Sequence, residues 1–127
     1  ISNRYSEQLE ATVNNLKKLG FPNAEKSNVL LREDDRSKSD RRKSVSDYYN
    51  VIMLIGDNLA DFNDEFEVKL AEERTNYTDQ MSESFGTKLI VLPNPNYGDW
   101  ESNGLFGGKS YSNQERDSIR KSNINSY

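Results

Sequence analysis

The stretch VIMLIGDNLADF, residues 51–62, decides the fold of this chain. It opens with an unbroken apolar run at 51–55 and continues through a glycine into two acids spaced four residues apart, Asp57 and Asp61. A short continuous apolar run that ends at turn residues is typical of a strand covered on both faces. We therefore predict a fully buried strand at 51–55 with two carboxylates just beyond its end.

The composition limits the chemistry open to the chain. Its 127 residues suit a single domain, but only 33% are hydrophobic and 30% are charged, a low apolar share for a self-sufficient core. The net charge of −4 argues against binding to a nucleic-acid backbone. The sequence has no cysteine and no histidine, which excludes disulfides, thiolate chemistry and histidine-dependent triads. Any metal would have to be held by oxygen atoms, which favours Mg²⁺ or Ca²⁺.

Outward from the central strand, helical and strand patterns alternate. Apolar residues at helical spacing predict a helix over 5–19, which ends at Gly20. The other predicted elements are strands at 28–32 and 88–92 and helices over about 41–49 and 63–82. Strands that alternate with helices, each strand a continuous apolar run, predict an α/β fold: a Rossmann-like parallel sheet with helices on both faces.

Ligands of such sheets bind beyond the carboxyl ends of the strands, which here points to the loops at 32–38, 56–61 and 93–100. Asp57 at a strand end is commonly a turn or helix-cap residue. With Asp61 four residues later, it equally suits an oxygen site for Mg²⁺. The residues alone leave both interpretations open.

Other polar and aromatic candidates are also ambiguous. Lys38, in SKSDRR, has the pattern of a solvated loop lysine, and Ser2 and Asn3 serve equally well as helix caps. Tyr97 and Trp100 lie in a loop rich in proline and glycine. They either cover the sheet edge, which we favour, or stack on a base or ring.

The ordered set of motifs is more specific than its parts. The motifs are ISNR at 1–4, KSDRR at 38–42, GDNLADF at 56–62 and FGTKLIVLPNPNYGDWE at 85–101. In this order the sequence resembles the haloacid dehalogenase superfamily of phosphatases, and more narrowly the class C bacterial acid phosphatases of the surface-lipoprotein 5'-nucleotidase branch. The resemblance covers 1–108, as the C-terminal part of such a phosphatase core, and 109–127 is a polar tail with a predicted short helix.

The resemblance, and not composition or spacing, implies roles for individual residues. It implies that Ser2 holds the phosphoryl group and that Lys38 neutralises the phosphate and the nucleophile. Asp57 would coordinate Mg²⁺, with Asp61 supporting the metal shell. The implied substrate-binding residues are Asn3, Arg4, Tyr97 and Trp100. Phosphoryl transfer needs mainly positioning and charge neutralisation, which a lysine and carboxylate-held Mg²⁺ supply.

The sequence departs from the family's pattern in one respect. The family's D-x-D-x-T strand, whose first aspartate attacks phosphorus and whose second acts as general acid and base, is not found in these 127 residues. We expect the chain to be the C-terminal half of such an enzyme, starting at the second motif. Alone it would not hydrolyse phosphoesters, because the covalent acceptor is absent. A strand edge would be exposed for the N-terminal segment of the same protein.

The function that the resemblance implies is a Mg²⁺-dependent acid phosphatase for small phosphomonoesters, such as nucleoside monophosphates, acting through an aspartyl-phosphate. The alternatives are a non-catalytic relative that keeps the phosphate and Mg²⁺ pocket, and a structural domain whose acids are caps. The expected partners are the substrate and the missing N-terminal segment, with a homodimer also compatible and no nucleic-acid polymer. Resemblance alone implies an extracytoplasmic location, secreted or lipid-anchored.

Overall fold

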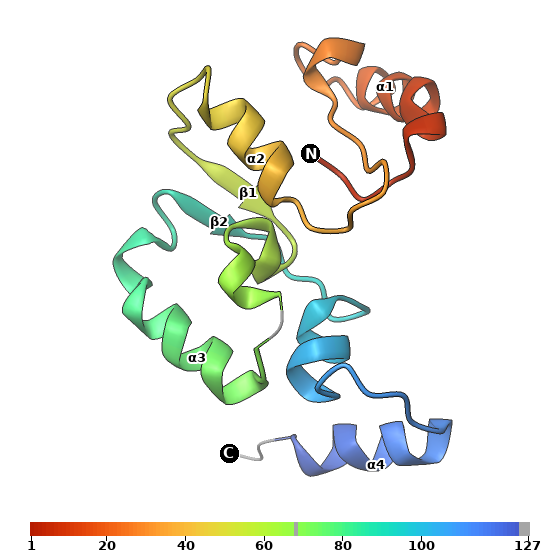
Figure 1. The fold of residues 1–127 in the computed structure, drawn as a ribbon, viewed down its shortest axis with the longest axis vertical. Helices are drawn as coiled ribbons and strands as arrows, with labels where there is room; N and C mark the ends of the chain where they lie inside the picture. The colour runs from red at the N-terminus through yellow and green to blue at the C-terminus, as the bar shows by residue number, and fades with distance from the viewer. Residues whose placement is uncertain (68, 125–127) are drawn as a thin grey trace. The chain divides into compact units, whose positions relative to one another are not determined.

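The computed structural model describes residues 1–67 and 69–124, which fall into two compact units, Ile1–Asn50 and Val51–Tyr127. The helices and strands are α1 (Leu9–Lys18), α2 (Ser39–Ser46), β1 (Leu54–Gly56), α3 (Ala71–Gln80), β2 (Leu89–Val91) and α4 (Asn113–Ser122) (Figure 1). Short 3₁₀ turns occur at Ser6–Gln8, Lys26–Asn28, Leu59–Asp61, Asp64–Phe66 and Ser82–Ser84, and a π-helical turn at Trp100–Leu105. Within the described ranges, no helix has the length and apolar character needed to cross a membrane.

The first unit, Ile1–Asn50, begins with α1. The buried residues of this helix are Thr12 and Val13, which are 8% and 4% exposed. The helix ends where the sequence predicts, because Gly20 adopts a φ of 78° and donates its N–H to the carbonyl of Lys17 at 3.0 Å. A glycine suits this left-handed position since it has no Cβ to clash with the preceding turn. The helix predicted over 5–19 is therefore confirmed, although its first turn is the 3₁₀ turn Ser6–Gln8.

The strand predicted at 28–32 does not form a ladder. Within the first unit the segment makes one isolated parallel bridge, between Tyr5 and Arg32. The N–H of Arg32 donates to the carbonyl of Arg4 at 2.9 Å, and the N–H of Ser6 donates to the carbonyl of Arg32 at 3.0 Å. On the side before Arg32 the N–H of Ser2 donates to the carbonyl of Leu30 at 2.9 Å, but within the described residues this contact does not extend the bridge into a strand. The prediction of a strand at 28–32 was therefore wrong.

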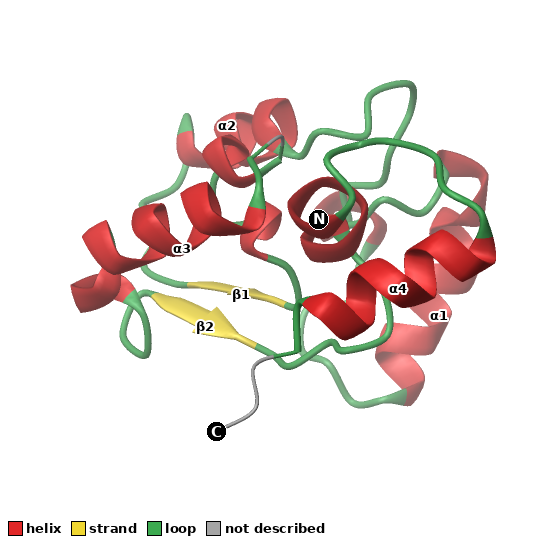
Figure 2. Cartoon of the chain, turned by 90° about the horizontal axis from the view of Figure 1, so that it is seen from below, coloured by secondary structure: helices red, strands yellow, loops and turns green. Residues whose placement is uncertain are grey.

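The second unit, which begins at Val51, holds a two-stranded parallel sheet (Figure 2). β1 pairs with β2 in the register Leu54 with Leu89 and Gly56 with Val91. Parallel neighbours need a crossover connection, and the chain between the two strands supplies α3. The parallel α/β arrangement predicted from the alternating pattern is confirmed, and the register brings the loops that follow β1 and β2 out at the same end of the sheet.

The apolar run at 51–55 is exposed, which corrects the prediction of a fully buried strand. β1 begins only at Leu54, and Ile52 and Ile55 are 79% and 62% exposed. Leu89 on the neighbouring strand is only 7% exposed. An apolar run is buried only where other elements cover it, and within the described residues β1 has a single strand neighbour. The apolar pattern indicated a segment suited to burial, but it could not indicate which elements would pack against that segment.

The helix predicted over 63–82 is divided into the 3₁₀ turn Asp64–Phe66 and α3. The Asn63 side chain accepts the N–H of Glu65 at 3.0 Å and begins the turn. The Glu73 carboxylate then accepts the N–H of Leu70 at 2.9 Å and begins α3. Such local caps start a new helical segment where a continuous helix would have passed through. Residue 68, inside the predicted helix, lies outside the described residues.

The C-terminal part of the second unit is tied to its π-helical turn. α4 lies in the segment 109–127, for which the sequence predicts a short helix; residues 125–127 are outside the described residues. Its Arg120 forms an ion pair with Glu101 of the π-helical turn at 2.7 Å, and the Glu101 side chain is only 13% exposed. The guanidinium of Arg116 lies 4.9 Å from the ring centroid of Phe106, a ring that is 4% exposed. The π-helical turn and α4 therefore form one packed assembly.

Candidate functional site

The residues that the sequence assigns to phosphate binding lie at two places in the first unit. Ser2, Asn3 and Arg4 form the segment that precedes the first 3₁₀ turn, and the Ser2 Oγ accepts the N–H of Arg4 at 3.2 Å. The N-cap position of that turn is Tyr5, so neither Ser2 nor Asn3 caps a helix. Lys38, at partial exposure, directly precedes α2. The capping alternative for Ser2 and Asn3 is therefore not seen.

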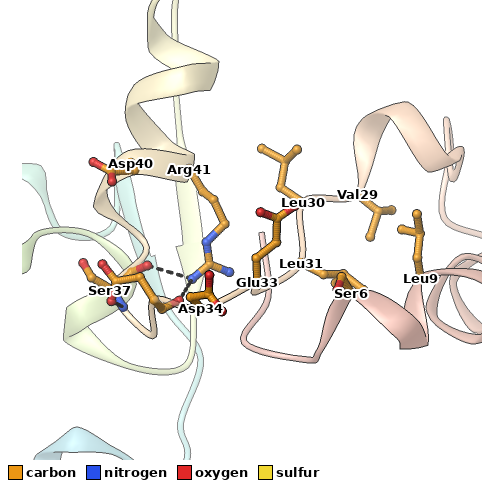
Figure 3. A pocket seen from close by; sticks show the side chains of 11 residues that line it. Ser6, Leu9, Val29, Leu30, Leu31, Glu33, Asp34, Ser37, Asp40 and Arg41 are labelled. Atoms are coloured by element: carbon orange, nitrogen blue, oxygen red, sulfur yellow. Dashed lines mark hydrogen bonds between the residues drawn. The ribbon is translucent and has the colours of Figure 1, made fainter.

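A pocket of about 500 Å³ also lies in the first unit (Figure 3). Apolar side chains, including Leu9 and Val29, line one side, and the acids Glu33 and Asp40 stand with Arg41 on the other. Neither Ser2 nor Lys38 is among the residues that line it. The pocket is thus a neighbour of the predicted phosphate-binding residues and is not built from them.

Asp57 lies directly after β1, at the carboxyl end where the fold predicts a ligand site. Its Oδ2 accepts a hydrogen bond from the Nδ2 of Asn94 at 2.7 Å. Asn94 lies in the loop after β2, which the parallel register brings out beside the loop after β1. Within the described residues no other hydrogen bond is made by the Asp57 carboxylate, and the residue is exposed. The Asn94 contact fixes the orientation of an exposed carboxylate.

The carboxylate of Asp61 shapes the turn that carries Asp57. Its Oδ2 accepts the backbone N–H groups of Asp57 and Asn58, both at 3.1 Å. The Asn58 side chain in turn accepts the N–H of Ala60 at 3.4 Å, which completes a reciprocal cap on the 3₁₀ turn Leu59–Asp61. Asp61 therefore supports the loop through the backbone, and its role in supporting the metal shell stays a prediction.

Gly56 is needed for the approach of Asp61. A Cβ at position 56 would stand 2.6 Å from both the Cβ and the Oδ2 of Asp61, a separation that cannot be tolerated without a shift. We expect Gly56→Ala to displace the Asp61 carboxylate, break both backbone hydrogen bonds and loosen the Asp57 loop. In the full-length protein this should weaken Mg²⁺ binding, measured by titration calorimetry, by about tenfold or more, as loss of an orienting partner generally does.

The matched variant Asp61→Asn keeps one acceptor oxygen and the size of the side chain, so its effect on Mg²⁺ binding should be the smaller of the two. If Gly56→Ala binds Mg²⁺ as tightly as the parent, the Asp61 carboxylate does not set the position of Asp57.

Asn58 is contacted by the loop that follows β2 and also by a residue of α3. A Cβ at Gly98 would stand 2.5 Å from the Asn58 Nδ2, so the two loops are in close contact. Arg74, on α3 and 4% exposed, donates to the carbonyl of Phe66 and, at 3.4 Å, to the Asn58 side chain. Burial lowers the pKa of Arg74, and the charge of Asp99 partly opposes this. The Asp57 loop is therefore backed by a buried cation.

The two aromatic residues of the 93–100 loop differ in their surroundings. Tyr97 is 70% exposed, which does not fit the packing role favoured for it from the sequence. Trp100 is partly buried, begins the π-helical turn and donates its Nε1–H to the carbonyl of Tyr97 at 3.2 Å. The exposed ring of Tyr97 remains available for stacking, and its substrate-binding role stays a prediction.

The donor set of the second unit fits part of a magnesium site. Among the described residues no group of three or more acid, histidine or cysteine side chains comes together. Mg²⁺ in phosphate-handling sites is commonly held by one or two carboxylates, with waters and phosphate oxygens completing its shell. Asp57, an exposed residue with one carboxylate oxygen held by Asn94, suits one such ligand.

Sequence reasoning missed two residues that this geometry brings forward, Asn94 and Arg41. Asn94 contacts Asp57 across 37 positions in the chain, and Arg41 contacts Ser2 across 39. The register of β1 and β2 is the signal that could have found Asn94, because it pairs the ends of the two strands. No local pattern indicates the contact of Arg41.

Comparison with known proteins gives the family. Residues 1–100 match the family model described as HAD superfamily, subfamily IIIB (acid phosphatase). The chain is also similar to the structure of the class C acid phosphatase from Bacillus anthracis, with 38% sequence identity, a TM-score of 0.88 and coverage of 98% of this chain and 52% of that one. A structure of that enzyme with tungstate bound matches at 38% identity and a TM-score of 0.89, covering 98% and 53%.

The chain thus spans about half the length of the solved structures it matches, 52% and 53%. The fold class predicted from the sequence, haloacid dehalogenase-like, is confirmed by these likenesses. With 100 of its residues matched by the family model, this chain belongs to the acid phosphatases of subfamily IIIB in the HAD superfamily.

Proposed function

We propose that these residues are part of a metal-dependent phosphomonoesterase. The observation that carries the proposal is the Asp57 carboxylate, held by Asn94 at 2.7 Å at the carboxyl end of β1 in a chain of an acid phosphatase family. In this proposal Asp57 is a ligand of Mg²⁺, and Asp61 keeps the Asp57 loop in place. When bound, Mg²⁺ would neutralise charge that develops on the phosphoryl oxygens.

The phosphate-binding role falls to residues of the first unit. The hydroxyl of Ser2 would donate to a phosphoryl oxygen, and the ammonium of Lys38 would neutralise its charge. Asn3, Arg4, Tyr97 and Trp100 stay predicted substrate contacts. The tungstate bound in the Bacillus anthracis enzyme supports only the binding of a phosphate-like anion in this proposal, because tungstate is a tetrahedral oxyanion of the same class as phosphate.

The nucleophile and the acid/base of the proposed reaction lie outside these 127 residues. We propose that they belong to an N-terminal segment of the same protein that pairs with the uncovered side of β1. The exposure of Ile52 and Ile55, 79% and 62%, supports this partner, because covering them would remove apolar surface from water. The proposed substrates are small phosphomonoesters such as nucleoside monophosphates, and the extracytoplasmic location stays a prediction from resemblance.

The proposal is tested by metal removal from the full-length protein. We expect EDTA to lower its hydrolysis of p-nitrophenyl phosphate by about 100-fold or more, since a metal contributes several kcal/mol of transition-state stabilisation. Added Mg²⁺ should restore the rate, and AMP assayed by phosphate release should respond in the same way.

Far-ultraviolet circular dichroism of the EDTA-treated protein serves as the control, because a loss of fold would also lower the rate. A folded, metal-free protein that hydrolyses the ester at the original rate contradicts the proposed role of the metal. A folded protein inactive under all conditions supports the non-catalytic binding relative instead.

A further inference from the structure

Arg41 connects two segments of the first unit that are far apart in the sequence. It is the third residue of α2, and its side chain turns back toward the start of its own helix (Figure 3). Its Nη2 donates to the carbonyl of Ser37 at 2.7 Å and to the Oδ1 of Asn3 at 2.8 Å. Its Nη1 donates to the carbonyl of Ser2 at 2.5 Å. One guanidinium thus holds the segment at 2–3 to the segment that ends at 37.

Both segments carry a predicted phosphate ligand. Ser2 is one of them, and Lys38 directly follows Ser37. Arg41 bonds the carbonyl of Ser2 and not its hydroxyl, whose hydrogen is left for an acceptor such as a phosphoryl oxygen. The contacts of Arg41 therefore fix where Ser2 and Lys38 stand relative to one another without using the group that would bind phosphate.

The contact set suits arginine and no other side chain. The planar guanidinium presents several N–H donors at fixed angles, whereas a lysine ammonium is a single point at the end of a flexible stem. Desolvation is the main cause that lowers the pKa of Arg41, and the charge of Asp35 opposes it. An arginine nevertheless stays charged at neutral pH, so its hydrogen bonds to Ser2, Asn3 and Ser37 are charge-assisted.

We propose that Arg41 is a positioning residue, which sets the spacing between Ser2 and Lys38 so that both reach one phosphoryl group. This inference rests on the proposed function, because it takes Ser2 and Lys38 as the phosphate ligands. Arg41 itself donates to protein oxygens and leaves phosphate binding to the two residues that it holds.

The test measures binding of orthophosphate to the full-length protein by titration calorimetry, with Mg²⁺ binding measured on the same samples. We expect Arg41→Lys and Arg41→Gln each to weaken orthophosphate binding by about tenfold or more, because a misplacement near 1 Å can cost about 100-fold. Arg41→Lys keeps the positive charge, so weaker orthophosphate binding by this variant would show that the geometry of the guanidinium contacts matters. Mg²⁺ binding should change by less than about twofold, since the predicted metal ligands lie in the other unit.

Arg36→Lys is the matched control. Arg36 stands in the same loop with an exposed side chain, and the change again replaces guanidinium by ammonium. Orthophosphate binding should be the same as in the parent. If Arg36→Lys weakens orthophosphate binding as much as Arg41→Lys does, the inference is overturned. Replacing any guanidinium of this loop by an ammonium group would then have the same effect.

Lys38→Met separates failure of the inference from failure of the proposed function. If Lys38→Met leaves orthophosphate binding unchanged, the proposed phosphate site is wrong and the inference fails with it. If Lys38→Met weakens binding but both Arg41 variants bind as the parent does, the inference alone is overturned. If the Arg41 variants lose Mg²⁺ binding and thermal stability together with orthophosphate binding, Arg41 is a structural residue of the fold, and the inference is likewise overturned.

Discussion

Replacing Asp57 by asparagine in the full-length protein should lower kcat/KM for p-nitrophenyl phosphate by about 1,000-fold. The substitution keeps the size of the side chain and removes the negative charge proposed to hold Mg²⁺. A metal contributes several kcal/mol to a charged transition state. About 4 kcal/mol corresponds to three factors of ten in rate. Mg²⁺ binding measured by calorimetry should weaken in parallel, which links the lost rate to the lost ligand.

Asp79→Asn is the matched control for this prediction. Asp79 lies on α3 with an exposed side chain, and the same chemical change there should leave kcat/KM within about twofold, as is usual for exposed positions. An Asp57→Asn protein that keeps both its rate and its Mg²⁺ affinity would falsify the assignment of Asp57 as a metal ligand. In that case the turn-and-cap interpretation left open by the sequence would stand.

The second large effect concerns stability. Phe66 is fully buried, at 0% exposed, and its ring lies 4.9 Å from the ring of Tyr77 in an edge-to-face arrangement. Its carbonyl also accepts a hydrogen bond from Arg74. We expect Phe66→Ala to lower the free energy of unfolding by about 3–5 kcal/mol, through lost apolar burial and the cavity left behind. Urea unfolding of the full-length protein, followed by circular dichroism, measures it.

Phe21→Ala provides the comparison, because it removes the same ring from a position that is 57% exposed. The free energy of unfolding should fall by less than about 1 kcal/mol, because the exposed ring contributes little buried apolar area. Similar losses for the two variants would mean that Phe66 does not anchor the second unit, and that the site loop backed by Arg74 depends on other contacts.

The sequence predicted the parallel α/β class because alternating apolar runs and helical spacing depend on the chain alone. The runs at 51–55 and 88–92 do enter a parallel sheet, as β1 and β2, although each strand is shorter than predicted. Burial depends on the elements that surround a segment and not on the segment itself. Ile52 was therefore predicted to be buried, although it is 79% exposed. The strand predicted at 28–32 failed for a similar reason: a strand needs a paired neighbour, and within the described residues this segment has only the isolated bridge between Tyr5 and Arg32.

The residues of the candidate site likewise fall into those that the sequence predicted and those that it did not. Asp57 and Asp61 were found because they follow an apolar run at a spacing that one turn can bring together, and the structure does bring them together, at 3.1 Å between the Asp61 Oδ2 and the Asp57 backbone nitrogen. Asn94 and Arg41 were not found, because their contacts join residues 37 and 39 positions apart. Such contacts depend on register and loop path, which propensity and periodicity do not encode.

The close approach of Gly56 and Asp61 also bears on how the loop can vary during evolution. The Cβ of Asp61 itself lies 2.6 Å from the place where a Cβ at position 56 would stand. Shortening Asp61 to alanine or serine would keep that obstruction, and only glycine at 61 would remove it. Position 56 should therefore stay glycine unless position 61 also becomes glycine. A larger residue at 56 would then arise in related sequences only together with glycine at 61, which makes glycine at 56 a historical as well as a steric commitment.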